Sequence, residues 1–215
     1  MQLVDFDVGY DVVLSSSECQ EIIDFYKDKK EHDREAATRQ EGVTTSDYNE
    51  ATRAGKVNFW HNTEFPYERD IKDAIYRYCN LTDIVIYEED PGLPNVGWQF
   101  SIYDKVGDHF NEHQDQSVSH FTNKFFYNNT HKNEGVKDQT MRSYRKVSAS
   151  IQLSNPNDYE GCTLQIRDKR DSMFALPRTQ GSVLVFPSYA QHVVTPLTSG
   201  TRYAMVGWFY GPLWR

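Results

Sequence analysis

The 215-residue sequence has few cysteines, and no two of them lie close together. Cys19, Cys79 and Cys162 form an odd set without a C-x-x-C spacing, which argues against a disulfide framework and for a reducing compartment. The N-terminus lacks the basic residue and long apolar run of a signal peptide. No stretch is long and apolar enough to cross a membrane. We therefore expect a cytoplasmic protein without a membrane partner.

The sequence is also poor in positive charge. Lys and Arg number 23 against 31 Asp and Glu, which gives a net charge of -8 at pH 7. This balance disfavours a general binder of nucleic-acid backbones. The content of 38% hydrophobic and 25% charged residues is typical of a soluble globular chain. Because we find no internal repeat or linker, we predict one domain over residues 1–215.

An N-terminal helix is predicted directly after a short edge strand in residues 2–14. Ser15 and Glu18 have the spacing of a capping box, which is a signature of a helix start. An apolar stripe with the i, i+3, i+4, i+7 spacing of a helix follows at Cys19, Ile22, Ile23 and Tyr26. The charged residues after this stripe are expected to end the helix on a solvated face.

A second helix is predicted after a polar loop at residues 33–55 and a weakly alternating strand at 56–60. Pro66 suits the first turn of this helix. Its apolar stripe consists of Ile71, Ala74, Ile75 and Tyr78. Residues 81–87 then resemble a strand. A cluster of turn-forming residues follows at Asp90-Pro91-Gly92-Leu93-Pro94.

From Trp98 onward the hydrophobic period changes to two, the period of a strand. Apolar and polar residues alternate at 98–103, 148–154 and 162–166, and further strands are predicted at 182–186 and 202–209. Turn signals separate them at Asn155-Pro156-Asn157-Asp158, Glu160-Gly161 and Ser199-Gly200. Two helices followed by many short strands predict a mainly β (α+β) protein, with helices packed on an antiparallel sandwich or barrel. The helical support would span about residues 1–95 and the barrel about residues 96–215.

One short motif in the barrel region offers metal ligands. His113 and Asp115 form an H-x-D pair, and side chains two apart on a strand point the same way. Imidazole with carboxylate suits Fe(II), Mn(II) or Zn(II). His109 and His113 also have the spacing of a zinc-binding helix, but Gly107 and Asp108 are poor helix residues. An H-x-D pair is common by chance, so a surface histidine at a strand end is the alternative for His113.

His192 and Arg202 extend the candidate site. His192 follows the strand at 183–186 and a Pro-Ser turn, and a polar residue held by a rigid strand end is a typical site position. Arg202 begins a mostly apolar strand, where a guanidinium needs a carboxylate partner. That partner is either a ligand or an internal Asp or Glu. Tyr103 either hydrogen-bonds the same ligand or packs in the core. The other histidines are interpreted as solvated: His32, His61, His120 and His131.

A long segment at residues 116–146 interrupts the strands directly after the H-x-D pair. It is polar and aromatic, and loops of this length inside a compact domain are usually functional or disordered. Its position allows two interpretations, a substrate lid and a mobile insertion. Its aromatic residues suit a peptide as well as a stacked base.

The ordered motifs of residues 96–215 resemble the Fe(II)- and 2-oxoglutarate-dependent oxygenases of the prolyl 4-hydroxylase-like family, in particular its bacterial and phage branch. Tyr103 stands ten residues before His113, and Phe110 three before it, as in that family. RKVSASIQLSNPNDYEGCTLQI resembles the family's strand, turn and hairpin, and GSVLVFPSYAQHVVTPLTSGTRYAMVGWFYGP is close to its most specific stretch. Two features depart from the pattern: Cys162 replaces a second glycine, and the 116–146 segment is longer than usual.

The resemblance implies a double-stranded β-helix, which is a jelly-roll barrel of the cupin-like kind. It implies that His113, Asp115 and His192 bind Fe(II), and that Arg202, with Tyr103 assisting, binds 2-oxoglutarate in the catalytic site. O2 would be the other cosubstrate, and ascorbate is a candidate additional cofactor. The implied activity is hydroxylation of an unactivated C–H bond, with succinate and CO2 as co-products. The substrate would be a prolyl or other residue of a protein or peptide, or a small molecule, in the host cytoplasm if a phage encodes the chain.

Other positions and other functions follow more weakly from the sequence. Trp208 takes the position of the family's strand tryptophan, and Gln99 and Thr195 are candidates to support the metal ligands from behind. A binding module that kept the barrel and its metal but lost catalysis is one alternative function. A metal-dependent hydrolase or isomerase on a cupin-like barrel is another, but it would have no use for Arg202 at its spacing.

Overall fold

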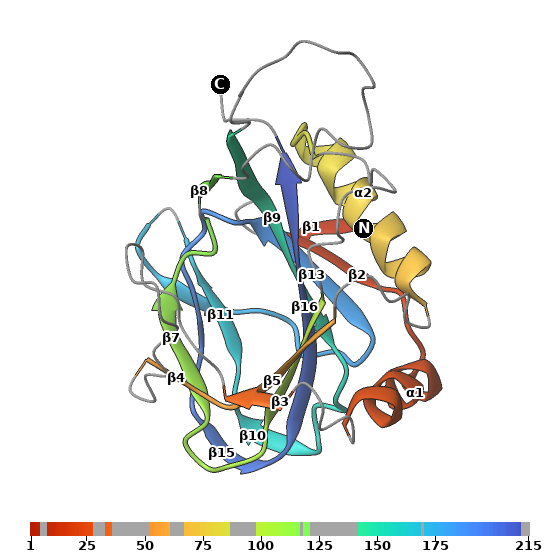
Figure 1. The fold of residues 1–215 in the computed structure, drawn as a ribbon, viewed down its shortest axis with the longest axis vertical. Coiled ribbons are helices and arrows are strands. Elements are labelled where there is room, and N and C mark those ends of the chain that lie inside the picture. The colour runs from red at the N-terminus through yellow and green to blue at the C-terminus, as the bar shows by residue number, and fades with distance from the viewer. Residues whose placement is uncertain are drawn as a thin grey trace.

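The computed structural model describes residues 1–4, 8–27, 33–35, 52–60, 67–86, 98–116, 118–120, 142–168 and 170–211. Two sheets face each other, and both helices cover the outer side of the larger sheet (Figure 1). Within these ranges, no helix is long and apolar enough to cross a membrane. The predicted mainly β architecture with flanking helices is confirmed.

The two predicted helices form, and their apolar stripes are their buried faces. α1 (Ser16–Tyr26) begins at the predicted capping box, where the Ser15 and Glu18 side chains each accept from the other residue's backbone N–H. α2 (Glu68–Thr82) runs through part of the segment expected to be a strand. The strand prediction at 81–87 is therefore wrong for residues 81–86. The reason is local: the chain leaves the helix at Asp83 with a positive φ of 53°, and no strand among the described residues pairs with residues 81–86.

The predicted Pro66 helix start and the turn at 90–94 lie outside the described residues. The loop prediction at 33–55 is wrong at both ends of the segment. Its start forms the short strand β3 (Asp33–Glu35), which pairs with the strand at Lys56–Trp60, and its end forms β4 (Arg53–Ala54), which pairs with the strand at His109–His113. Within residues 2–14 the structure has two strands rather than one: β1 (Gln2–Val4) pairs with β2 (Val8–Val12), and β2 pairs on its other side with the strand at Ser182–Pro187.

The larger sheet is antiparallel throughout. Its order is β1 (Gln2–Val4), β2 (Val8–Val12), β13 (Ser182–Pro187), β9 (Arg142–Gln152), β16 (Arg202–Gly211), β6 (Trp98–Tyr103), β5 (Lys56–Trp60) and β3 (Asp33–Glu35), with β8 (Val118–His120) on β9.

The smaller sheet faces it and has the order β12 (Met173–Ala175), β11 (Leu164–Arg167), β14 (His192–Val194), β7 (His109–His113) and β4 (Arg53–Ala54). A separate pair joins β10 (Tyr159–Gly161) to β15 (Leu197–Gly200). The turns predicted at 160–161 and 199–200 are thus wrong, because both dipeptides pair within this ladder. The turn at 155–158 is confirmed by a bond from the Asp158 N–H to the Asn155 carbonyl at 3.0 Å.

The central strands of the larger sheet separate two interiors. Their apolar residues, such as Phe100 and Ile151, pack against the helices in one core cluster. Their polar residues are buried as well, on the opposite face: Gln99, Ser101, Ser148, Ser150 and Gln152. Since strand side chains alternate between faces, the period-two pattern here divides a helix-packed core from a polar inner wall. That inner wall is where the functional site lies.

Candidate metal centre

His113, Asp115 and His192 come together at the edge of two neighbouring strands. His113 ends β7 and His192 begins β14, and the two residues are partners in the antiparallel register. Asp115 follows two residues after the end of β7. Its Oδ1 lies 3.5 Å from Nε2 of His113, and its Oδ2 lies 3.4 Å from Nε2 of His192. In the part of the chain that the structure describes, this is the group of side chains that could hold a metal ion.

Both imidazoles are oriented by a backbone carbonyl. Nδ1 of His113 lies 2.7 Å from the Asn111 carbonyl oxygen, and Nδ1 of His192 lies 2.9 Å from that of Ala190. A carbonyl only accepts, so each Nδ1 carries the proton and donates it. Each Nε2 therefore keeps its lone pair for a metal, in the arrangement usual for histidine ligands. Two such nitrogens and one carboxylate fit the facial set that Fe(II) takes in oxygenases.

Asp115 is held as a buried carboxylate. Its side chain is 9% exposed, and its Oδ2 accepts a hydrogen bond from Ser148 Oγ at 2.8 Å. Burial alone would raise the pKa of Asp115, but His192, His113 and the Ser148 hydroxyl together hold it well below its usual value. Burial lowers the pKa of His192. The carboxylate is thus ionised and the imidazole neutral, the states that bind a metal.

Arg202 lies on β16 at the inner wall and is 2% exposed. Its Nη2 donates to Gln152 Oε1 at 2.7 Å, but its Nε is buried without a hydrogen-bond partner. No carboxylate of a described residue forms an ion pair with it, so the internal salt bridge considered from the sequence is not found there. A buried guanidinium without an anion is costly. Its setting therefore suits an incoming carboxylate.

Tyr103 shares the pocket with Arg202, its register partner across β6 and β16. The Arg202 guanidinium lies 5.5 Å from the centre of the Tyr103 ring. Burial raises the pKa of Tyr103, so its phenol is neutral. The residue also packs in the second core cluster, which confirms the core interpretation from the sequence. Its hydrogen bond to a ligand stays a prediction. One pocket contains all five predicted site residues: Tyr103, His113, Asp115, His192 and Arg202.

The supporting residues predicted from the sequence differ in outcome. Trp208 lines the same pocket, and its buried indole N–H has no partner among the described residues. Gln99 also lines the pocket and donates to Ser101 Oγ at 2.8 Å. Thr195 instead accepts the Thr163 N–H at 2.9 Å and ties two loop segments together. Its Oγ1 thus belongs to the loop rather than to the metal-binding group.

Sequence reasoning missed two residues of the site. Ser148 donates a hydrogen bond to Asp115. The strand that carries Ser148 was predicted, but this role was not. Arg53 lies in the same pocket, 6% exposed, with its Nε buried and without a hydrogen-bond partner. Arg53 fell in the segment that was predicted to be a loop. The only sequence feature that could have indicated its role is that it lies close before the weakly alternating residues 56–60.

Several other predictions meet the edge of the described residues. His109 lies in β7, so a zinc-binding helix at His109 and His113 is excluded. His32, His61 and His131 and most of the 116–146 segment lie outside the described residues, as does the side chain of His120. The two ends of that segment pair with each other as β8 and the start of β9.

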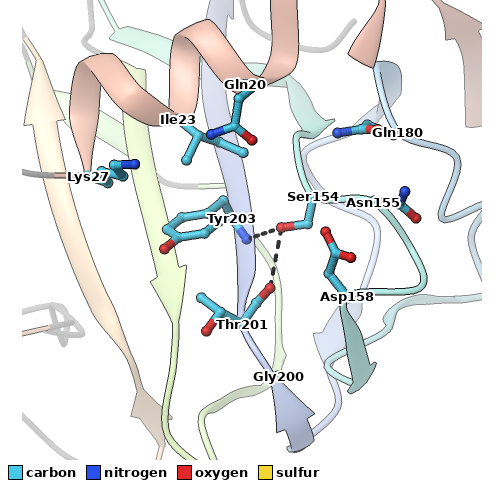
Figure 2. A pocket seen from close by; sticks show the side chains of 10 residues that line it. All are labelled: Gln20, Ile23, Lys27, Ser154, Asn155, Asp158, Gln180, Gly200, Thr201 and Tyr203. Atoms are coloured by element: carbon cyan, nitrogen blue, oxygen red, sulfur yellow. Dashed lines mark hydrogen bonds between the residues drawn. The ribbon is translucent and has the colours of Figure 1, made fainter. Parts of the chain in front are cut away.

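A second cavity, of about 370 Å³, lies between α1, the residues that follow the end of β9, and the beginning of β16 (Figure 2). Its polar groups serve the fold. Ser154 Oγ accepts the Tyr203 N–H at 2.7 Å and donates to the Thr201 carbonyl at 3.4 Å, and Gln180 donates to the Leu153 carbonyl at 2.9 Å. The candidate chemistry therefore belongs to the pocket around Asp115.

The fold has close counterparts among solved structures. A prolyl 4-hydroxylase from Pseudomonas putida superposes with a TM-score of 0.61 at 16% identity, covering 94% of this chain and 91% of that one. A Trichoplax adhaerens prolyl hydroxylase, solved with a hypoxia inducible factor peptide fragment, gives a TM-score of 0.62 at 15% identity, covering 96% and 84%. These likenesses define the class: a double-stranded β-helix of the prolyl hydroxylase kind, as the resemblance implied.

The sequence then places the chain within a family. The profile of the 2OG-Fe(II) oxygenase superfamily matches residues 98–210, more than half of the chain. The protein belongs to this superfamily, which implies Fe(II), 2-oxoglutarate and O2 as its cofactor and cosubstrates. A PKHD-type hydroxylase from Cupriavidus pinatubonensis is 28% identical over 152 residues, 67% of this chain and 59% of that relative. The chain thus spans less than two thirds of this relative's length.

Proposed function

We propose that this protein is an Fe(II)- and 2-oxoglutarate-dependent hydroxylase. His113, Asp115 and His192 bind the metal, and Arg202 binds the carboxylate of 2-oxoglutarate that lies far from its keto group. Tyr103 assists as a neutral hydrogen-bonding group. When bound, the iron and cosubstrate supply oxidative chemistry that converts 2-oxoglutarate and O2 to succinate and CO2 while a substrate C–H bond is hydroxylated.

One observation carries this proposal. The three metal-binding side chains and a buried arginine with an unpartnered Nε share one pocket. A hydrolase or isomerase needs the metal but not a buried guanidinium beside it. A keto acid with a second carboxylate uses both, because the guanidinium and carboxylate form a strong, oriented pair.

The residues around the site each have a definable task. The Asn111 and Ala190 carbonyls fix the imidazole tautomers, and Ser148 holds the carboxylate. The Phe110 ring stacks on the His113 imidazole, and the Phe186 ring contacts the His192 imidazole edge to face. A site arranged in advance in this way loses little free energy to reorganisation when its ligands bind.

For the substrate, we propose a prolyl or other residue of a protein or peptide. The support is that similar proteins carry the names prolyl hydroxylase and PKHD-type hydroxylase. Incubation with candidate peptides, Fe(II), 2-oxoglutarate and O2 should give peptides heavier by one oxygen atom. Mass gain on a free amino acid but on no peptide would replace this substrate class with a small molecule.

Anaerobic titration with Fe(II) and 2-oxoglutarate tests the cofactor assignment. Chelation of the keto acid should produce a broad charge-transfer band in the visible spectrum. The Arg202→Met variant should need at least about tenfold more 2-oxoglutarate to reach half of that band, since a hydrogen bond between charged groups contributes about 1.5–3 kcal/mol. Tight Fe(II) binding without any band would contradict the proposal, and a band without succinate in air would indicate a binding module.

A further inference from the structure

Arg53 lines the pocket beside the three metal-binding residues, and the function proposed above gives it no task. It is 6% exposed, and its Nε has no hydrogen-bond partner. Among the described residues that line the pocket, Asp115 is the acidic one, and its carboxylate oxygens lie 3.5 Å from Nε2 of His113 and 3.4 Å from Nε2 of His192. Because an unpaired buried cation is costly, an arginine in this position points to a ligand that supplies an anion.

The backbone of Arg53 is fixed to the strand that carries His113. β4 pairs with β7 so that Arg53 lies opposite Phe110, and the Asn111 N–H donates to the Thr52 carbonyl at 2.9 Å. The guanidinium lies over the Phe110 ring, 4.4 Å from its centre. That ring in turn stacks on the His113 imidazole, with the two centres 3.6 Å apart. One aromatic ring thus separates the guanidinium from a candidate metal ligand.

Burial lowers the pKa of Arg53, and Tyr103 and Asp115, which line the same pocket, each raise it. Tyr103 is the register partner of Arg202, whose guanidinium lies 5.5 Å from its ring centre. Tyr103 therefore neighbours both guanidinium groups. Arg53 lies on β4 of the smaller sheet, next to the strand that carries His113, whereas Arg202 lies on β16 of the larger sheet and donates to Gln152.

The charges in the pocket call for two anionic groups. A bound metal would engage the Asp115 carboxylate and so remove the partial compensation that Asp115 gives to Arg53. Two guanidinium groups then face the pocket, and 2-oxoglutarate carries two carboxylates. If the distal carboxylate pairs with Arg202, the carboxylate next to the keto group is the one left to accept from Arg53, in addition to its part in chelating the metal.

We propose that Arg53 binds the carboxylate at the keto acid end of 2-oxoglutarate, so that the pocket offers one guanidinium to each carboxylate of this cosubstrate. This inference rests on the proposed function and adds a second cosubstrate-binding residue to it. Tyr103 lines the same pocket as both guanidinium groups.

Calorimetric titration of the Zn(II)-loaded protein tests the inference without turnover. Two ligands are compared: 2-oxoglutarate, and 2-oxopentanoate, which has the same keto acid end but a methyl group in place of the distal carboxylate. The Arg202→Met variant should weaken 2-oxoglutarate binding and leave 2-oxopentanoate within about threefold. The Arg53→Met variant should weaken both ligands, each by about tenfold or more, the scale of one charge-assisted hydrogen bond.

Arg145→Met is the matched control. Arg145 also stacks on an aromatic residue of the pocket, 4.4 Å from the Trp208 ring centre, and loses the same charge. Its removal should change neither affinity by more than about twofold, because a charge outside the pocket is screened by solvent. If Arg53→Met fails to fold, Arg53→Lys takes its place, since it keeps the charge and loses the planar fork. It should still weaken both ligands.

The outcomes separate this inference from the proposed function. If the wild-type protein binds neither keto acid, both fall. If it binds both, and Arg53 variants match Arg145→Met, only the role of Arg53 is wrong. A loss confined to 2-oxoglutarate would also overturn the inference, because Arg53 would then act at the distal carboxylate.

Discussion

His113 and His192 are direct partners in the antiparallel register between β7 and β14, although they lie far apart in the sequence. Their ring centres are 4.2 Å apart. Strand pairing therefore brings the two imidazoles together, and the turn after β7 adds Asp115.

Removal of one imidazole should abolish tight metal binding. We expect His192→Ala to lower the affinity for Fe(II) or Mn(II) by more than about 100-fold, because loss of a partner behind a ligand already costs about 10–100-fold. Equilibrium dialysis with metal analysis measures the effect. His109→Ala, on the same strand but outside the metal-binding group, is the control and should retain the metal. Wild-type affinity in His192→Ala would show that the metal lies elsewhere.

Ser148 should matter through Asp115. Ser148→Ala removes the hydroxyl that donates to Asp115 Oδ2 at 2.8 Å, and we expect metal affinity to fall by about tenfold. Ser182→Ala is a matched control, because Ser182 is equally buried on β13 but its Oγ has no partner. Calorimetry with Mn(II) compares the three proteins. Equal losses in both variants would mean that Ser148 acts through packing alone.

Metal binding should stabilise the fold. The site is assembled by strand pairing, so the unfolded chain cannot bind with the same affinity. At a free metal concentration of 100 times Kd, the free energy of unfolding should rise by about 2.7 kcal/mol. Urea unfolding with Mn(II) and with a chelator measures this difference. Asp115→Ala should show no such gain, and a gain as large as in the wild type would contradict the assignment of this ligand.

The contact between α2 and the larger sheet should be sensitive to Glu68. This side chain is 7% exposed, accepts the Trp98 indole N–H at 2.8 Å and pairs with Lys72 at 2.7 Å. Glu68→Ala leaves these donors with one acceptor fewer, and we expect a loss of about 1–3 kcal/mol in the free energy of unfolding.

Two variants control the Glu68 experiment. Glu68→Gln keeps an acceptor for the indole and should recover part of the stability. Glu160→Ala, at an exposed position, should stay within about 0.5 kcal/mol of the wild type. Denaturation midpoints in urea that are the same for Glu68→Ala and Glu160→Ala would show that this contact does not anchor α2.

The sequence by itself determined the features that depend on near neighbours. The capping box of Ser15 and Glu18, the helical stripes and the period-two strands all formed where local spacing predicted them. These signals are local because helix and strand periods are set by backbone geometry within a few residues. Local spacing left several interpretations of the site residues open, and the family resemblance of the ordered motifs was needed to group them. One pocket contains all five of these residues: His113, Asp115, His192, Arg202 and Tyr103.

Tertiary structure decided what depends on distant partners. Residues 81–86 have strand-like composition but pair with no strand in the described part of the chain, whereas 159–161 and 197–200 have turn-like composition and pair with each other. Arg53 entered the pocket only because β4 pairs with β7. The tautomers of both imidazoles depend on the orientation of the Asn111 and Ala190 carbonyl groups, which accept from the Nδ1 atoms. Pairing between segments far apart in sequence leaves no periodic trace in either one, so the residues behind the metal-binding group became visible only in the fold.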